Sequence, residues 1–260
     1  MQSLFAVIHE DDDLLVVHKP ADLVCHPTKG DEYSSLISRA RLYLQRQVFR
    51  PVQPGGSAAA AASEPQPRLI HRLDRETSGL VLIAKTPGTA RELGKVWETR
   101  GVSKEYLAIV HGQVAPDQGI IDAPLGRDEH SRVAIKDCVR PGGQPAQTEF
   151  RVEKRFAGAG GALFSLLRLH PLTGRKHQIR IHLAHLGHPI VGDKLYGGDP
   201  DLYLALVERR LTAEQRARLM LSNHALHACR LQFDWRERHY DFTTPPEAAF
   251  INFINGSLEV

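Results

Sequence analysis

The sequence predicts an α+β fold with a largely antiparallel sheet. Strand-like segments outnumber helix-like ones and follow one another in adjacent runs, which is typical of hairpin-connected strands rather than of alternating parallel units. Hydrophobic residues make up 42% of the 260 positions, enough to form a buried core. This length allows one large domain or two small ones.

The first elements are identified from apolar runs and the residues that end them. Leu14–Val17 is a continuous apolar run that predicts a buried strand, and a Lys-Pro pair stops it. Apolar spacing over residues 33–47 predicts a helix with arginines among its polar positions. Residues 50–68 are rich in Pro, Gly and Ala without a periodic face, so we expect a flexible surface insertion. A second buried strand is predicted at 80–84.

The later elements alternate between strand and helix patterns. Strands are predicted at 104–112, 147–156, 162–171 and 225–235, and helices at 87–101, 175–187 and 212–221. Thr212 with Gln215 three residues later is typical of a capping box. Gly187 is a natural helix-ending residue.

Composition excludes several classes of protein. The three cysteines are an odd number, widely separated and without a C-x-x-C pair, which argues against a disulfide framework and a zinc-thiolate site. The N-terminus has no basic start, and no apolar run approaches 18 residues, so neither a signal peptide nor a membrane span is expected. We therefore predict a cytoplasmic protein.

Charge is distributed unevenly along the chain. The net charge of +3 is mild. From Ser165 to Ile190, however, there are five histidines and no acid, together with four basic residues: Arg168, Arg175, Lys176 and Arg180. This asymmetry predicts one basic face suited to a polyanionic partner.

Three residues are candidates for chemistry. Asp74 lies in a charged turn before a buried strand, where it is either a turn carboxylate that accepts backbone hydrogen bonds or a nucleophile or base. Arg180 follows the apolar Ile179 and is predicted at the edge of the core, where a guanidinium requires a carboxylate partner; Asp74 is one candidate. Tyr106 lies in a predicted strand, where an aromatic residue is normally part of the core.

A histidine cluster raises the question of a metal site. His182, His185 and His188 are spaced by three residues, but no Asp or Glu lies within the helix and His188 follows Gly187. We expect no metal, and expect these histidines to be solvated or to face RNA.

Several motifs together carry a resemblance to a known family. "HRLDRETSGL", "KEYLAIVHG" and "LTGRKHQIRIHLAHLGHPIVGDKLYG", in this order, resemble the motifs of the RluA-type family of pseudouridine synthases. "LVVHKPADLVCHP" resembles the family's opening strand, and "NHALHACRLQF" with "TTPPEAAF" resembles its closing strand and tail. Two positions depart from the pattern, Asp22 where glycine is usual and His18 where asparagine is common, and both bear on loop shape.

The resemblance implies a pseudouridine synthase fold, with a long mixed, mostly antiparallel sheet flanked by helices and a central catalytic cleft. Residues 1–260 are then expected to form a single catalytic domain without the accessory RNA-binding domain that precedes it in many relatives. The resemblance also implies that Asp74 is the essential carboxylate, that Tyr106 lines the uracil pocket, and that Arg180 forms an ion pair with Asp74.

The implied reaction isomerises uridine in RNA to pseudouridine. The N1–C1′ bond breaks, the uracil turns and C5 bonds to C1′, so no cofactor is required. Arg180 beside Asp74 would favour the ionised carboxylate and orient it. Whether Asp74 attacks C1′, attacks C6 or removes the C2′ proton stays open. Tyr106 would stack on the base near C5.

RNA is the implied partner of a monomeric protein, and either ribosomal or transfer RNA is compatible with the motifs. The target uridine must leave its stack, which costs a few kcal/mol. We expect Arg72 to occupy the vacated space. Further RNA contacts are expected from His71, Arg168, Arg175, Lys176 and His177.

Two other functions are compatible with parts of the sequence. A catalytically silent relative could bind RNA as a folding chaperone, although such a protein would have no need to retain Asp74, Tyr106 and Arg180 together. A hydrolase built on His71 and Asp74 lacks a nucleophile or oxyanion signature.

Overall fold

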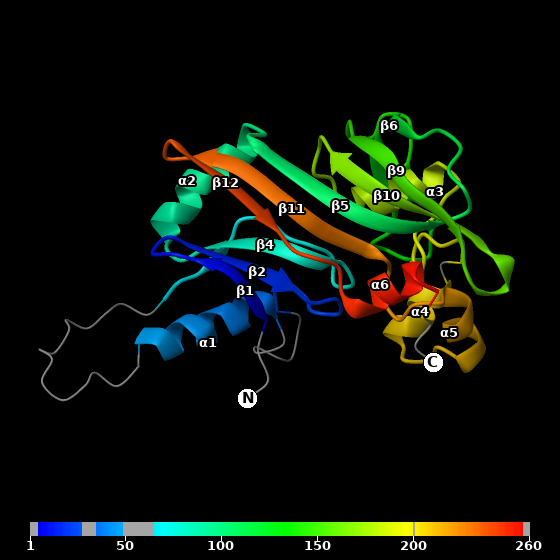
Figure 1. The fold of residues 1–260 in the computed structure, drawn as a ribbon, viewed down its shortest axis with the longest axis horizontal. Coiled ribbons are helices and arrows are strands. Elements are labelled where there is room, and N and C mark those ends of the chain that lie inside the picture. Colours follow the sequence, from blue (N-terminus) through cyan, green and yellow to red (C-terminus); the bar gives the residue numbers. More distant parts are fainter. Residues whose placement is uncertain (1–4, 28–34, 49–64, 200, 257–260) are drawn as a thin grey trace, which may run out of the picture. The chain divides into compact units, whose positions relative to one another are not determined.

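The computed structural model describes residues 5–27, 35–48, 65–199 and 201–256. The chain divides into two compact units, and Figure 1 labels most of their helices and strands. Unit 1 comprises Met1–Val102 and Leu231–Thr244, and unit 2 comprises Ser103–Arg230 and Pro245–Val260. The chain therefore passes from one unit to the other three times.

Unit 1 is an antiparallel sheet with two helices. Its elements are β1 (Ala6–Glu10), β2 (Leu14–Lys19), α1 (Leu36–Val48), β3 (Arg68–Leu69), β4 (Ser78–Ala84), α2 (Pro87–Glu98), the second half of β11 (Leu226–Trp235) and β12 (Arg238–Thr243). Strand β2 pairs with β1 on one side and β4 on the other, both antiparallel, while β12 pairs with β11. Helix α1 lies beneath β1 and β2 in Figure 1.

The core of unit 1 explains the unbroken apolar runs in its strands. All seven residues of β4 are buried, which requires cover on both faces of the sheet. Helix α2 begins at a Thr86 cap, whose hydroxyl accepts the Thr89 N–H at 3.1 Å, and buries Leu93 against the sheet. The Phe233 and Tyr240 rings stack with centroids 5.0 Å apart and complete this core.

Unit 2 combines antiparallel strands with short helices. Its elements are β5 (Val102–His111), β6 (Gln118–Asp122), β7 (Leu125–Arg127), β8 (Asp137–Val139), β9 (Gln147–Ala157), a 3₁₀ turn (Ala159–Gly161), β10 (Leu163–Pro171), α3 (Gln178–His185), α4 (Asp201–Val207), α5 (Ala213–Leu219), α6 (Ala248–Ile254) and the first half of β11. Strand β10 lies between β5 and β9, and β6 pairs with β9, all antiparallel.

The core of unit 2 combines apolar strand residues with aromatic rings. Phe164 of β10 contacts Phe156 of β9 at 5.7 Å and Phe253 of α6 at 5.0 Å between centroids. Ile179 and Leu183 of α3 lie in the same cluster. Edge-to-face aromatic pairs add to area burial and hold α6 against the strands.

Most predicted elements are confirmed, including the α+β class, the antiparallel pairing and the Thr212–Gln215 capping box of α5. The helix predicted at 175–187 is shorter, because His177 has a left-handed φ of 55° and helical geometry begins only at Gln178. Leu186 is the C-cap of this helix and is 37% exposed. Gly187 follows with φ +85°, as expected for a residue that ends a helix.

Two sequence predictions concern segments at the limits of the described chain. The insertion predicted at 50–68 lies mostly outside the described residues, which resume at 65 with β3 beginning at Arg68. Over the described ranges, none of the helices combines the length and the apolar run that a membrane crossing needs. The central catalytic cleft and the single catalytic domain stay predictions.

Candidate active site

Asp74 lies in unit 1, in the loop between β3 and β4. Its backbone carbonyl accepts the Thr77 N–H at 3.2 Å, which closes a turn directly before the buried strand. Thr77 and Ser78 are both buried, although polar, because they continue into β4. The Thr-Ser-Gly segment therefore fixes the loop at its C-terminal side, and Asp74 itself is half-buried.

Lys19 fixes the residue that follows Asp74. Its side chain is fully buried at the end of β2, and Nζ donates to the carbonyls of Pro20 at 2.8 Å, Leu23 at 2.9 Å and Arg75 at 3.0 Å. In the sequence this lysine marks only the end of a strand. Its alternation with the apolar residues of β2, two positions after Val17, was the available signal of burial, and a buried ammonium requires several acceptors.

Cys25 fixes the residue that precedes Asp74. Its Sγ donates to the Leu73 carbonyl and accepts the Leu73 N–H, each at 3.4 Å. Burial raises the pKa of the Cys25 thiol, so the thiol stays protonated and able to donate. Buried side chains from another part of unit 1 thus hold the backbone on both sides of Asp74.

The two departures from the family pattern lie close to this loop. Asp22 has a φ of 68°, in the region that favours glycine and that Asp tolerates better than most residues. Its carboxylate accepts from Arg75 Nε at 2.7 Å in an exposed ion pair. His18 Nδ1 lies 2.9 Å from the Thr244 hydroxyl.

His71 and Arg72 differ sharply in their surroundings. His71 Nε2 accepts the Leu82 N–H at 3.1 Å, and its ring stacks on Trp97 at 5.6 Å. Because this nitrogen already accepts a backbone hydrogen bond, the structure does not support the alternative function of a hydrolase with His71 as its base. Arg72 is exposed, and its guanidinium forms no hydrogen bond or ion pair with any residue in the described ranges.

Tyr106 and Arg180 belong to unit 2. Tyr106 is on β5 opposite Leu169 of β10 and packs, partly buried, against the core of unit 2. Arg180 is on α3 and is only 7% exposed. It donates to Asp193 through Nε at 2.7 Å and Nη2 at 2.9 Å, and its guanidinium lies over the Tyr196 ring at 5.0 Å.

Asp193, the partner of Arg180, is a site residue that the sequence pattern alone does not reveal. It is completely buried, and its Oδ1 also accepts the N–H groups of Leu195 and Tyr196 at 2.9 and 3.0 Å. Burial alone would raise the pKa of this carboxyl, but the Arg180 charge and these hydrogen bonds outweigh it and lower the pKa far below 3.8. An acid between the apolar pairs Ile190–Val191 and Leu195–Tyr196 was the available signal.

A buried hydrogen-bond network places Arg180. Gln178 Nε2 donates to the Thr148 hydroxyl at 2.9 Å, and this hydroxyl lies 2.8 Å from His182 Nδ1. His182 Nε2 lies 3.0 Å from the Ala123 carbonyl. Gln178 Oε1 accepts from the Thr173 hydroxyl at 2.7 Å. The first turn of α3, which carries Arg180, is therefore tied to β9.

The prediction that His182 is solvated or RNA-facing is wrong. Its side chain is fully buried, and burial lowers the pKa of its imidazole. The residue lies on the buried side of α3, where its two ring nitrogens contact the Thr148 hydroxyl of β9 and the Ala123 carbonyl after β6. His185 is exposed, and His188 Nδ1 lies 2.8 Å from the His111 carbonyl. Within the described ranges no group of three potential metal-ligating side chains could hold an ion.

The remaining predicted RNA-contact residues have partners from other strands. Arg168 pairs with Glu105 at 2.8 Å and Glu153 at 2.7 Å, and Lys176 pairs with Asp137 at 2.9 Å. Two further residues of the basic stretch bind polar groups, namely Arg175 Nε at the Pro145 carbonyl (3.1 Å) and His177 Nδ1 at the Tyr196 hydroxyl (2.9 Å). Their roles toward RNA stay predictions.

Comparison with known proteins agrees with the motifs and the fold. The family model described as RNA pseudouridylate synthase matches residues 13–185, about two thirds of the chain. The chain belongs to this family. The match includes the loop of Asp74, strand β5 with Tyr106, and Arg180 with the rest of α3.

Curated members of the RNA pseudouridylate synthase family align with most of the chain. Ribosomal large subunit pseudouridine synthase D of Haemophilus ducreyi is 34% identical over 228 residues, covering 88% of this chain and 62% of that protein. The protein of the same name from Pasteurella multocida is 38% identical over 194 residues, covering 75% and 53%. The chain thus spans between half and two thirds of the length of these relatives.

Solved structures of the family share the fold. Human RNA Pseudouridylate Synthase Domain Containing 4 has a TM-score of 0.68 at 25% identity, over 97% of this chain and 92% of that one. Human RNA Pseudouridylate Synthase Domain Containing 1 has a TM-score of 0.71 at 24% identity, over 95% and 86%. The predicted pseudouridine synthase fold is therefore confirmed.

Proposed function

We propose that this protein isomerises uridine to pseudouridine in structured RNA, with Asp74 as the essential carboxylate. The observation that carries the proposal is the way the Asp74 loop is held. Lys19 binds the carbonyl of the following residue, and Cys25 binds both backbone groups of the preceding one. A carboxylate that must reach one atom of a ribose or a uracil needs this kind of positional control.

The assignment of the other groups follows the family motifs. Tyr106 forms a wall of the uracil pocket, and Arg180 is the ion-pair partner of Asp74. Asp193 supports this role because it fixes the Arg180 guanidinium through Nε and Nη2. The reaction needs no cofactor, since no electron or atom is exchanged with another molecule.

Arg72 is the residue we propose to occupy the space left by the flipped uridine. Two observations support this role. Arg72 is exposed and unpaired within the described chain, and it lies one residue from buried Leu73 and two from Asp74. The neighbouring Arg75, by contrast, is already paired with Asp22.

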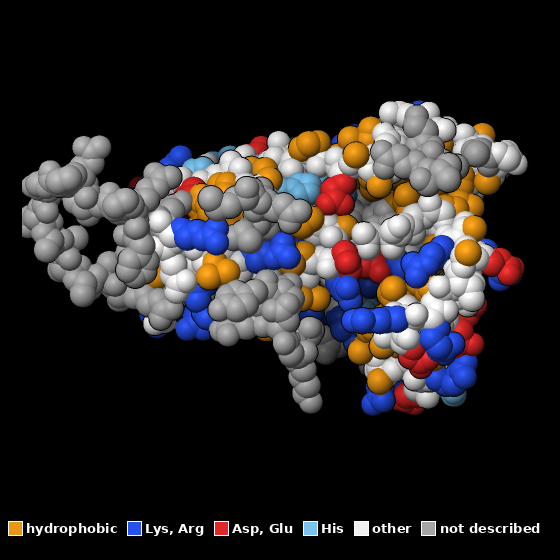
Figure 2. Space-filling view, turned by 90° about the horizontal axis from the view of Figure 1, so that it is seen from below, with side chains coloured by type: hydrophobic (Ala, Val, Ile, Leu, Met, Phe, Trp, Pro, Cys, Tyr) orange, Lys and Arg blue, Asp and Glu red, His pale blue; other side chains and the backbone are white. Residues whose placement is uncertain are grey.

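A basic helix in unit 1 also supports RNA binding. Helix α1 carries Arg39, Arg41 and Arg46 and no acid. Figure 2 shows Lys and Arg side chains gathered on the face of the molecule that carries this helix. A patch of one sign raises the local concentration of a polyanion such as RNA.

The substrate that we propose to test first is large-subunit ribosomal RNA, because both curated relatives are named for it; transfer RNA is the alternative. A monomer in the cytoplasm is part of the proposal. The alternative function, an RNA-binding relative without turnover, predicts RNA binding and no product.

The proposal is tested by chemical mapping of pseudouridine in cellular RNA with and without the gene, followed by assays on unmodified RNA transcribed in vitro. Asp74→Asn is expected to abolish product formation while RNA binding persists. Asp12→Asn, an exposed carboxylate of the same unit, serves as the control and stays active. A fully active Asp74→Asn protein excludes the proposed mechanism.

The role of Arg72 has its own test. Arg72→Ala is expected to lower turnover on folded RNA about tenfold or more, the order of the few kcal/mol needed to hold a base out of its stack. Arg91→Ala, an exposed arginine of α2, provides the matched control. Unchanged turnover of Arg72→Ala on folded RNA would refute the role assigned to Arg72.

A further inference from the structure

Lys104 lies on β5 in unit 2, two residues before Tyr106. Side chains alternate along a strand, so Lys104 and Tyr106 share one face of the sheet. Glu105, between them, points to the other face, where its Oε2 binds Arg168 at 2.8 Å and its Oε1 lies 3.5 Å from Arg230. The acid closest to Lys104 in sequence is therefore turned away and already paired.

Among the residues that the structure describes, none supplies a counter-charge to the Lys104 ammonium. Its side chain is half-buried, and burial is the cause that lowers the pKa of the amine from its ordinary 10.5. Across the described ranges it forms no hydrogen bond or ion pair. Other lysines with restricted exposure have acceptors: Lys19 and Lys194 bind backbone carbonyls, and Lys85 binds Glu10 at 2.7 Å.

The surroundings of Lys104 leave an approach to its amine. Gly174, in the segment between β10 and α3, is exposed, and a Cβ built there would have Lys104 Nζ, at 3.8 Å, as its one neighbour within 4 Å. A partly desolvated cation without a partner weakens the folded protein. Such a cost is expected where a ligand supplies the missing charge.

We propose that Lys104 binds a backbone phosphate of the RNA substrate and holds the target nucleotide beside Tyr106. The proposal rests on the proposed function for its choice of RNA as the anion. A lysine binds phosphate as a point charge, and a partly buried lysine does so more strongly than one in open water. Lys104 is thus an RNA-contact residue of the Tyr106 face, in a motif where the sequence analysis singled out only the tyrosine.

This role predicts opposite effects on stability and on binding. Without RNA, Lys104→Met keeps the apolar stem and removes the unpaired charge, so its thermal midpoint should equal or exceed that of the wild type. With RNA, the same variant should bind about tenfold more weakly or worse, which corresponds to one charge-assisted hydrogen bond. If the lysine had a purely structural role, Lys104→Met would lower the thermal midpoint and leave RNA affinity unchanged.

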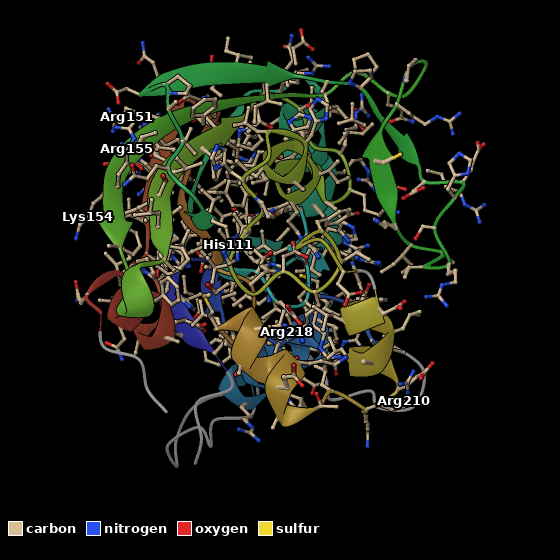
Figure 3. All side chains as sticks on the ribbon, turned by 90° about the vertical axis from the view of Figure 1, so that its right-hand side faces the viewer. His111, Arg151, Lys154, Arg155, Arg210 and Arg218 are labelled. Atoms are coloured by element: carbon tan, nitrogen blue, oxygen red, sulfur yellow. The ribbon has the colours of Figure 1, made fainter. Side chains whose placement is uncertain are left out.

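The experiment measures filter binding of unmodified large-subunit ribosomal RNA, transcribed in vitro, across a series of salt concentrations. Lys104→Met should reduce the slope of log K against log salt by about one phosphate contact. Lys104→Arg should retain most of the affinity. Lys154→Met is the control, since Lys154 projects outward from β9 in Figure 3 and its ammonium lies 5.6 Å from the Phe156 ring.

Two further readouts separate a phosphate contact from other roles. In the isomerisation assay, Lys104→Met should raise KM about tenfold and leave kcat within about threefold. The affinity advantage of the wild type over Lys104→Met should also disappear at alkaline pH as the Lys104 amine loses its proton, whereas Lys104→Arg does not titrate. Competition by uridine 5′-monophosphate as strong as that by RNA would identify a mononucleotide site and overturn the RNA assignment.

The outcomes distinguish this proposal from the proposed function. An unchanged salt slope and KM in Lys104→Met overturn the role of Lys104 and leave the isomerase proposal intact. Lys104-dependent RNA binding by a wild-type protein that forms no pseudouridine overturns the isomerase proposal and leaves the phosphate contact intact. A marked loss of stability in Lys104→Met, with RNA affinity unchanged, assigns the lysine a structural role and overturns the proposal.

Discussion

Asp193→Asn removes the negative charge from the buried ion pair with Arg180 and hardly changes side-chain volume. The asparagine oxygen can keep the place of Oδ1 and accept the Leu195 and Tyr196 N–H groups. Its amide nitrogen then takes the place of Oδ2, which accepts Arg180 Nε at 2.7 Å, and two donors face each other. The substitution therefore removes the Asp193 counter-charge from a buried guanidinium and places a donor against its Nε.

The expected cost follows from the burial of both partners. Loss of one member of a buried ion pair costs about 3–5 kcal/mol. The Tyr196 ring, which lies 5.0 Å from the Arg180 guanidinium, retains part of the stabilisation of that charge. We expect about 3 kcal/mol, which corresponds to a rise of roughly a hundredfold in the opening constant of α3.

Hydrogen exchange read by mass spectrometry measures this opening directly. Peptides that cover α3 and residues 193–196 should exchange about a hundredfold faster in Asp193→Asn, and peptides from β4 in unit 1 provide an internal reference. Asp117→Asn is the matched control, because Asp117 is 84% exposed in its ion pair with Arg155 and such pairs contribute little. An exchange rate of α3 within threefold of the wild-type rate would refute the view that Asp193 stabilises the charge of Arg180.

Two further substitutions test the packing of unit 2. His182 is buried with a lowered pKa, so the unfolded state binds more protons and wild-type stability should fall as the pH drops below about 6.5, by up to about 1.4 kcal/mol per pH unit. His182→Gln should show a smaller slope than the wild type in urea titrations, and an equal slope in both proteins would contradict the assignment. Gly197→Ala should destabilise unit 2 by about 1–3 kcal/mol or more, because its Cβ would lie 2.2 Å from the Asp193 carbonyl oxygen. Gly94→Ala, in open space on α2, should instead raise the melting temperature, and similar melting temperatures for the two variants would contradict this reading.

The fold could be predicted from local patterns because periodicity reports which face of an element is buried. It placed β2, β4, β5 and β9–β11 and the capping box of α5. The family resemblance supplied Asp74, Tyr106 and Arg180. Periodicity does not show which side chains bind each other, however. The hydrogen bond from Lys19 to the Arg75 carbonyl joins residues 56 positions apart and could be seen only in the folded chain. The same limit left Asp193 unrecognised, since its role depends on a loop that returns to α3.

Charge summed along the chain is a poor guide to charge on a face, and Arg168 illustrates the difference. The stretch 165–190 contains no acid, yet Arg168 lies between Glu105 and Glu153 of neighbouring strands. In the β5–β10 register Arg168 is opposite Leu107, so it points to the face away from Tyr106.

Arg168→Met should therefore destabilise unit 2, because Glu105 and Glu153 each lose one of their ion-pair partners, and leave the salt dependence of RNA binding unchanged. Lys104→Met should instead keep or raise the stability of the protein and reduce the salt dependence of RNA binding. A reduced salt slope in Arg168→Met would mean that the arginine leaves its glutamates when RNA binds. The basic stretch would then contribute to RNA affinity as the sequence alone predicts.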